Sequence, residues 1–330
     1  MGRLVTIAAL QPLGATDRVV YRHRHDPAAR NRHFLRYNIG ASTYDEAYCR
    51  AYGEEYLRYL EGWIARAAAR GVQFLLLPEV AFEPGVLAAP GEGVPPNPTM
   101  MEDAVRLYTW SEARFLERVG ALCRATGLYV GVSLPDARDG RLYNYGLILD
   151  DRGAVILRYA KVHLAPGPEE DYFTAGTAYP VCATPLGRYA FNICYDIQFP
   201  EAAACCEEAG AEILLHPSNG YTLPDEERDM GQNRLRVRAS DHHCAVVFSS
   251  YAPGRRHALG HSQVIARNGT VLAELRGKSA GLAVGVIEID CKRQWPGDGP
   301  DAPDRRQFVR RRRRPETYGA LVRRTDRSTH

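Results

Sequence analysis

The chain has 330 residues, of which 45% are hydrophobic and 25% are charged, an ordinary globular composition that excludes disordered and collagen-like classes. Its net charge is +3, but residues 304–330 carry ten arginines against three acidic residues, so residues 1–303 are mildly acidic. This distribution argues against nucleic-acid binding by the main part of the chain.

Short apolar runs bounded by Pro, Gly, Asn or Asp recur along the chain and are typical of buried strands. In chain order, the predicted strands are 4–10, 73–77, 128–134, 145–149, 155–159, 190–194, 211–216, 245–251, 262–266 and 282–289. Turn sequences at 150–153 and 267–269 predict two hairpins between neighbouring strands.

Between these strands, apolar residues at three- and four-residue spacing predict helices over 44–70, 101–126, 200–209 and 229–242. The first three stop before Gly71, Gly127 and Gly210, and glycine is a common residue just after a helix. Interleaved helices and strands without a linker predict a single α/β domain over 1–290, although the length alone would suggest about two domains. We interpret 12–43 as an insertion and 291–330 as an Arg-rich C-terminal arm that packs at an oligomer interface.

The compartment and the metal content follow from cysteine and histidine usage. Eight cysteines show no CxxC spacing, so we expect a reduced, cytoplasmic protein without a disulfide framework. His23, His25 and His33 lie in an arginine-rich segment without cysteines, so we expect no metal and no cofactor. The N-terminus does not read as a signal peptide, and no apolar run is long enough to span a bilayer.

Three polar residues lie at or just beyond predicted strand ends, where α/β sheets place their ligands. Glu79 follows an apolar strand and a proline, Lys161 lies between Ala160 and Val162, and Cys194 precedes a helix that starts at Pro200. A carboxyl in apolar surroundings can act as a general base, and a thiol at a strand-to-helix turn can act as a nucleophile. The structural alternatives are a solvated loop acid, a surface lysine and a core cysteine.

The lysine count adds weight to one of these residues. Only three of the 42 basic residues are lysines, so this sequence uses arginine wherever a positive charge is sufficient. Lys161 therefore points to a property that arginine lacks, such as a compact ammonium on a flexible stem.

The segments around these residues are recognisable. Residues 77–79 (LPE), 159–164 (YAKVHL) and 193–201 (ICYDIQFPE) resemble, in order and separation, the three signature segments of the nitrilase superfamily of carbon–nitrogen hydrolases. The sequence after the cysteine is similar to the amidase-like branch. The resemblance implies a four-layer α-β-β-α sandwich that assembles as a homodimer or a higher homo-oligomer.

The resemblance also implies roles for individual residues. Glu79 would take the thiol proton, and Cys194 would attack the substrate carbon. Lys161, together with the backbone N–H of Tyr195, would stabilise the oxyanion. Lys161 would also favour formation of the thiolate. A second glutamate, Glu169, with Glu170 as its close competitor, would orient the lysine.

The substrate is the least determined part of this prediction. We expect the pocket to be walled by Phe82, by the loop Ser218-Asn219-Gly220-Tyr221 and by the strand end near Tyr251. The reaction implied is cleavage of a non-peptide C–N bond in a small amide or an N-carbamoyl amine, with release of ammonia.

Other functions stay open at this stage. A nitrilase would convert a nitrile to a carboxylate and ammonia. A different class of function would be nucleic-acid binding through the arginine tail, but that segment also resembles the family's C-terminal element. A catalytically silent scaffold is a further alternative, and the intact Glu79-Lys161-Cys194 triad argues against it.

Overall fold

The computed structural model describes residues 2–14, 25, 38–88, 97, 99–220, 225–253, 260–292, 301, 304 and 312–322. The chain divides into two compact units, Arg3–Ile289 and a smaller unit of Met1–Gly2 with Asp290–His330. Most of the predicted 12–43 insertion lies outside the described residues, as do Tyr221 and most of the arginine run at 305–314.

The larger unit is built on two six-stranded sheets. The first has the strand order β14 (Gly281–Ile289), β1 (Arg3–Gln11), β3 (Phe74–Leu76), β5 (Tyr129–Arg138), β6 (Arg141–Leu149) and β7 (Val155–Ala160). The second has the order β13 (Val271–Glu274), β12 (Gln263–Ile265), β11 (Ala245–Ser249), β10 (Ile213–Pro217), β9 (Gly187–Phe191) and β8 (Cys182–Thr184). The short strands β2 (Asn38–Ile39) and β4 (Val86–Leu87) form a separate pair.

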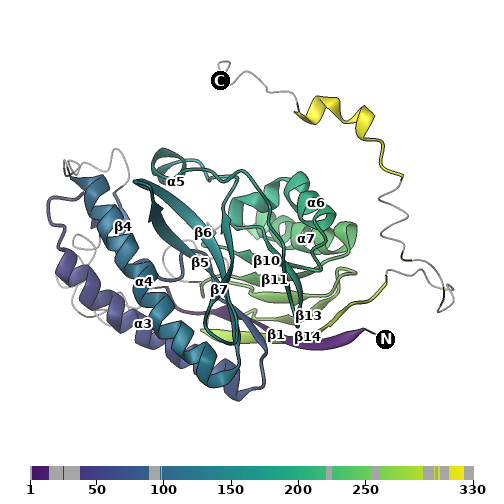
Figure 1. Cartoon of the computed structure of the whole chain (residues 1–330), viewed down its shortest axis with the longest axis horizontal. Coiled ribbons are helices and arrows are strands. Elements are labelled where there is room, and N and C mark those ends of the chain that lie inside the picture. Colours follow the sequence, from purple (N-terminus) through teal and green to yellow (C-terminus); the bar gives the residue numbers. More distant parts are fainter. Residues whose placement is uncertain are drawn as a thin grey trace. The chain divides into compact units, whose positions relative to one another are not determined.

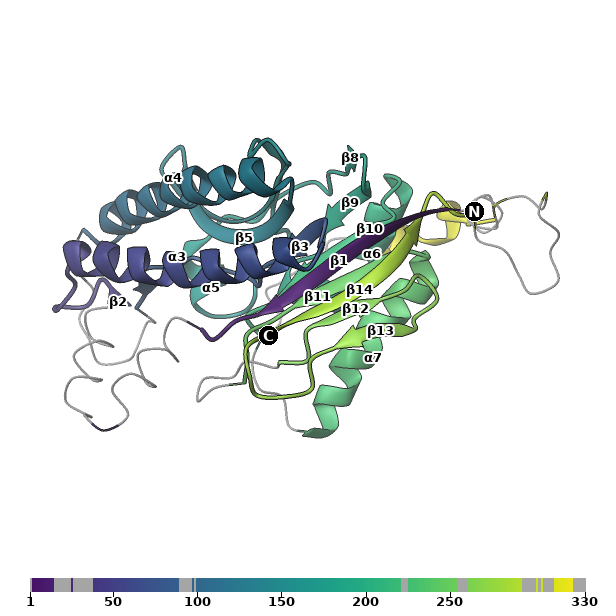
Figure 2. The same ribbon diagram turned by 90° about the horizontal axis from the view of Figure 1, so that it is seen from below.

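Helices cover the outer faces of both sheets. The long helices α3 (Glu46–Ala69) and α4 (Met100–Thr126) lie side by side on the first sheet (Figures 1 and 2). The helices α6 (Pro200–Glu208) and α7 (Asp225–His242) lie on the second sheet. The layers therefore follow the order α-β-β-α, and the predicted sandwich is confirmed.

The alternation of side chains along β1 explains how one sheet serves two apolar layers. Ala8 and Leu10 pack with α3 and α4, whereas Val5, Ile7 and Ala9 face the second sheet. Successive strand residues point to opposite faces, and both faces here are covered, so the strand is apolar throughout its centre.

Several element ends differ from the sequence-based expectation. The strand expected over 190–194 ends at Phe191, and Cys194 opens the 3₁₀ turn η1 (Cys194–Gln198). The strand expected over 128–134 continues through Pro135 to Arg138 and turns at Asp139-Gly140 into β6. Both turn residues have positive φ, of 51° and 73°, which is the backbone of a type I′ hairpin turn.

The described part of the smaller unit contains two short 3₁₀ helices, η2 (Pro315–Thr317) and η3 (Gly319–Val322). Leu321 and Val322 on the second of these are 65% and 85% exposed. Across the described residues of the chain, no helix has the length and apolar character needed to cross a membrane.

Candidate active site

The carboxyl ends of four strands deliver the predicted site residues to one end of the sandwich. Glu79 follows β3 and Lys161 follows β7 in the first sheet, while Cys194 follows β9 and Ser218 follows β10 in the second. Strands β9 and β10 run parallel to each other, and β7 is parallel to β5 and β3 through two antiparallel steps. Such an edge is the usual position of ligand sites in α/β sheets.

The centre of the site is a buried ammonium between two carboxylates. Lys161 Nζ lies 2.8 Å from Glu79 Oε1 and 2.9 Å and 2.7 Å from the two oxygens of Glu169, and Lys161 is only 1% exposed. Burial alone would lower the pKa of Lys161, but the nearby charges of Glu79, Cys194 and Glu169 outweigh it and raise the pKa above its ordinary value. The lysine is therefore charged at every physiological pH.

Glu169 is carried by the short helix α5 (Pro168–Tyr172). Besides Lys161, its carboxylate accepts a hydrogen bond of 2.7 Å from the backbone N–H of Ala165. Burial and the negative charge of Glu79 raise its pKa, whereas Lys161 and a hydrogen bond from Asn144 act in the opposite direction. The adjacent Glu170 is exposed, so only the first of the two competing glutamates contacts the lysine.

Glu79 is held from three sides. The amide of Asn144 donates to its Oε1 at 2.9 Å, and the backbone N–H of Asn219 donates to its Oε2 at 2.8 Å. The hydroxyl of Tyr251 donates to the backbone oxygens of Glu79 and Val80 at 3.0 Å and 3.1 Å. The loop after β10, which we expected to wall the pocket, therefore also orients the candidate base.

The thiol of Cys194 lies in a strained turn. Its φ is +46°, a conformation that non-glycine residues adopt rarely and that is typical of functional positions. The Ser218 hydroxyl donates to the sulfur at 3.4 Å. Tyr195 follows in the same turn, where the first backbone N–H groups have no acceptor inside the helix.

Opposing effects set the pKa of this thiol. Burial, followed by the charge of Glu79 and a hydrogen bond to it, raises the pKa of Cys194 to about 12, although Lys161 and Ser218 act to lower it. The resting sulfur is thus a neutral thiol, and its proton must be removed as it reacts. Lys161 lowers the pKa of the thiol, as expected, but burial and the charge of Glu79 outweigh this effect.

Asp196 ties the cysteine turn to the lysine segment. This fully buried carboxylate accepts hydrogen bonds from the backbone N–H groups of Ile193 and His163, at 2.9 Å and 3.0 Å, and from the Tyr159 hydroxyl at 2.7 Å. The His163 ring contacts it at 2.8 Å through Nδ1 and stacks on Phe199. A single side chain therefore links the backbone beside Cys194 to the backbone beside Lys161.

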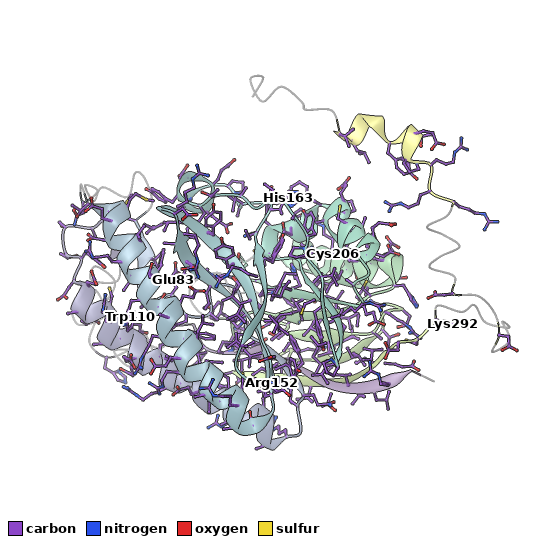
Figure 3. All side chains as sticks on the ribbon, in the orientation of Figure 1. Glu83, Trp110, Arg152, His163, Cys206 and Lys292 are labelled. Carbon is purple, nitrogen blue, oxygen red and sulfur yellow. The ribbon has the colours of Figure 1, made fainter. Side chains whose placement is uncertain are left out.

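A further carboxyl lies close to the site. Glu83, labelled in Figure 3, accepts a hydrogen bond of 3.2 Å from the Tyr108 hydroxyl. Burial, together with the charges of Glu79 and Glu169, raises its pKa to about 8 despite that hydrogen bond. Its protonation therefore changes near neutral pH.

Phe82, which we predicted to wall the pocket, does not lie with the other site residues. Phe82 is fully buried in the apolar layer between the first sheet and its helices, where its ring packs near Trp110 and Phe115. The chain turns after Glu79 with φ of +46° at Val80, and this turn directs Phe82 into the core.

Sequence reasoning also missed residues that the structure places in the site. Asn144 contacts Glu79 and Glu169 directly, and Asp196 holds the backbone of Ile193 and His163 beside Cys194 and Lys161, yet neither was assigned a role. Asn144 lies one residue before the predicted strand 145–149, where nothing in the local sequence marks it as a site residue. Among the described residues, no group of His, Cys, Asp or Glu side chains is placed to hold a metal ion.

Comparison with known protein families supports the resemblance found in the sequence. The carbon–nitrogen hydrolase family matches residues 50–296, which is most of the chain and includes Glu79, Lys161, Glu169 and Cys194. The chain belongs to this family. The family forms part of the nitrilase superfamily, so the resemblance seen in the three sequence segments is confirmed.

Relatives within the family are amidases. The chain is 33% identical over 196 residues to the deaminated glutathione amidase of Mus musculus, and the match covers 55% of this chain and 56% of that protein. It is 28% identical over 272 residues to the omega-amidase NIT2 of Xenopus tropicalis, covering 77% and 88% of the two chains. The chain thus spans little more than half the length of the mouse relative.

Solved structures show the same fold. A mutant of the Nesterenkonia AN1 amidase, from the nitrilase superfamily, matches with a TM-score of 0.67 at 22% identity, and the match covers 98% of each chain.

Proposed function

We propose that this protein is a thiol amidase that cleaves a non-peptide C–N bond in a small amide or an N-carbamoyl amine and releases ammonia. The observation that carries the proposal is the buried Lys161 ammonium held between Glu79 and Glu169, with the Cys194 thiol close enough to interact with Glu79 and Lys161. This arrangement supplies a base, an electrophilic stabiliser and a nucleophile at one point.

In the first half-reaction, Cys194 Sγ bonds to the carbonyl carbon while its proton passes to Glu79. The carbonyl π pair moves to oxygen, and the negative charge is met by Lys161 and the backbone N–H of Tyr195. As the oxygen pair returns, the C–N bond breaks and the nitrogen takes the proton from Glu79. Ammonia or an amine leaves, and a thioester remains on the sulfur.

In the second half-reaction, water loses a proton to Glu79 and bonds to the thioester carbon. The C–S bond then breaks, and the sulfur recovers the proton from Glu79. Glu169 keeps Lys161 aligned in both halves because two of the lysine contacts, at 2.9 Å and 2.7 Å, are to its carboxylate.

The relatives favour amides over nitriles. The protein from Mus musculus is a deaminated glutathione amidase, and the one from Xenopus tropicalis is an omega-amidase.

The test is an ammonia-release screen over small amides, N-carbamoyl amines and nitriles with the complete protein. Cys194→Ala is the matched blank, and a folded Cys194→Ala protein should release no ammonia from a responsive amide. Undiminished release by that variant contradicts the mechanism, and a response to nitriles alone replaces the amidase assignment with a nitrilase.

The assembly belongs to the same proposal. We propose that the protein acts as a homo-oligomer whose C-terminal arm packs between copies, which is supported by the exposed apolar side chains of Leu321 and Val322. The double variant Leu321→Asp/Val322→Asp should lower the mass measured by light scattering, and an unchanged mass argues against this role of the arm.

A further inference from the structure

The amide of Asn144 bridges the two carboxylates that surround the lysine. Its Nδ2 donates to Glu79 Oε1 and to Glu169 Oε1, each at 2.9 Å, and the residue is 2% exposed. The same two oxygens lie 2.8 Å and 2.9 Å from Lys161 Nζ. The neutral amide of Asn144 and the charged ammonium of Lys161 therefore donate to the same two carboxylate oxygens.

We infer that Asn144 is a positioning residue that holds Glu79 and Glu169 together around Lys161 so that Glu79 stays available as the base. This inference rests on the proposed thiol-amidase function. Asn144 has no contact with the nucleophile in this arrangement, so it would act through the carboxylates and not on the substrate.

A relay of hydrogen bonds fixes the direction of the amide. The backbone N–H of Val80 donates to Ser133 Oγ at 3.2 Å, and the Ser133 hydroxyl donates to Asn144 Oδ1 at 2.6 Å. Because Oδ1 accepts from the hydroxyl, the NH₂ group must face the carboxylates. The relay begins one residue after Glu79, so the base and the group that orients it move together.

The backbone of Asn144 is part of the same device. Its carbonyl oxygen accepts from the backbone N–H of Lys161 at 2.9 Å, where β6 lies beside the end of β7. One residue therefore locates the lysine through its main chain and both carboxylates through its side chain.

The physical need for such a donor follows from the charges. Two carboxylates that share one site disfavour each other's ionisation, so one of them tends to take up a proton. A hydrogen bond donated to the ionised form counteracts this, and Asn144 is among the groups that lower the pKa of Glu169. Because the amide is neutral, it can stabilise the carboxylates without placing a second positive charge beside Lys161.

A structural role and a positioning role make different predictions. If Asn144 only fills a position in the core, its loss should slow the reaction of the thiol equally at every pH. If its hydrogen bond lowers the pKa of Glu169, its loss moves the acid side of the pH profile upward, because Glu169 then holds a proton to higher pH.

The experiment measures alkylation of Cys194 by iodoacetamide from pH 5 to pH 9 in the complete protein. In this reaction the S–C bond forms, iodide leaves and the thiol proton passes to the base, so no natural substrate is needed. Peptide mass spectrometry separates Cys194 from Cys205 and Cys206. For Asn144→Ala, we expect the acid-side inflection to rise by about one pH unit, which is a tenfold slower reaction below the wild-type inflection.

Two serines give a graded variant and a matched control. Ser133→Ala removes the hydroxyl that orients the amide and should shift the inflection in the same direction by a smaller amount. Ser111 is equally buried on α4, where its hydroxyl donates to the Tyr108 backbone oxygen at 3.0 Å. Ser111→Ala should leave the profile unchanged.

The outcomes separate this inference from the proposed function. An unmoved inflection in Asn144→Ala, or a uniform decrease at all pH values, overturns the positioning role. If Asn144→Ala does not fold, the inflection of Ser133→Ala decides in the same way. If wild-type Cys194 shows no acid-side inflection, the pairing of thiol and base in the proposed function fails instead.

Discussion

Replacing Glu79 by glutamine separates the two effects that this carboxylate has on the thiol. Glu79 raises the pKa of Cys194 through its charge and a hydrogen bond, and in the proposed mechanism it also removes the thiol proton. Glu79→Gln keeps the shape of the side chain but abolishes the charge and the base. We expect the variant to have a more acidic thiol and a much lower turnover.

The magnitude follows from the pKa of about 12 for Cys194. At pH 7 a thiol with this pKa is ionised to about one part in 10⁵, so forming the thiolate without a base costs about 7 kcal/mol. Loss of a general base typically slows a reaction by about 10²- to 10⁴-fold. Loss of the Glu79 charge should lower the pKa of Cys194 by about one or two units, which recovers only part of the lost rate. We therefore expect turnover at pH 7 to fall by at least about 100-fold.

Two measurements test both halves of this expectation. Turnover is measured by ammonia release from the amide found in the screen, with Glu170→Gln as the matched control because Glu170 is the exposed neighbour of Glu169. The thiolate is measured at pH 10 by its ultraviolet absorbance, as the difference between each protein and the same protein carrying Cys194→Ala.

Turnover of Glu79→Gln within tenfold of the wild type would contradict the role of Glu79 as the base. Less thiolate at pH 10 in this variant than in the wild type would contradict its effect on the thiol pKa. If Glu170→Gln lost as much turnover as Glu79→Gln, then removal of any nearby carboxylate would be enough to lower turnover, and Glu79 would have no specific role.

Three further predictions concern the lysine, a turn and the alkaline stability. Lys161→Arg should reduce ammonia release at least 100-fold, since a guanidinium is too large for the space between two carboxylates. Lys278→Arg, on the exposed surface, is the control and should not reduce it. Near-normal activity of Lys161→Arg would refute this account of the lysine. Gly153→Ala should lower the free energy of unfolding by about 1–3 kcal/mol, because φ is +72° and a Cβ would lie 2.3 Å from a backbone oxygen of α4. Gly140→Ala, which has the same φ but open space around it, should cost less in urea denaturation, and equal costs would exclude the steric cause. The folded-state pKa of Cys194, about 12, is above the ordinary value of 9.0, so its contribution to stability is complete below pH 9 and is lost as pH rises toward 12. Between pH 8 and pH 10 the wild type should therefore lose about 1 kcal/mol more stability than Cys194→Ala, and parallel curves would contradict the raised pKa.

The main features of the site could be predicted because chemistry-bearing residues follow apolar strands directly. Glu79, Lys161 and Cys194 each come at or just after a run that reads as a buried strand, and the structure brings these strand ends to one edge of the sandwich. Glu169 could be proposed only through the family resemblance, since nothing in its local pattern marks it.

Other features depend on contacts that a linear pattern does not contain. Phe82 follows a turn with positive φ at Val80, so its direction could not be read from its apolar character. Asn144 lies one residue before the predicted strand 145–149, and its importance comes from two glutamates distant in sequence. The strand through Pro135 was cut short in prediction because proline cannot donate to a ladder. The strand continues there because β3, its neighbour on that side, pairs only as far as Gly131.

The burial of Lys161 makes the site accessible to a measurement of local opening. Of the three lysines, Lys278 and Lys292 are exposed, whereas Lys161 is 1% exposed. An amine-acylating reagent should therefore modify the two exposed lysines quickly and Lys161 only in molecules whose site has transiently opened. The slow acylation of this one residue would report how often the enclosed ion cluster separates, without any knowledge of the substrate.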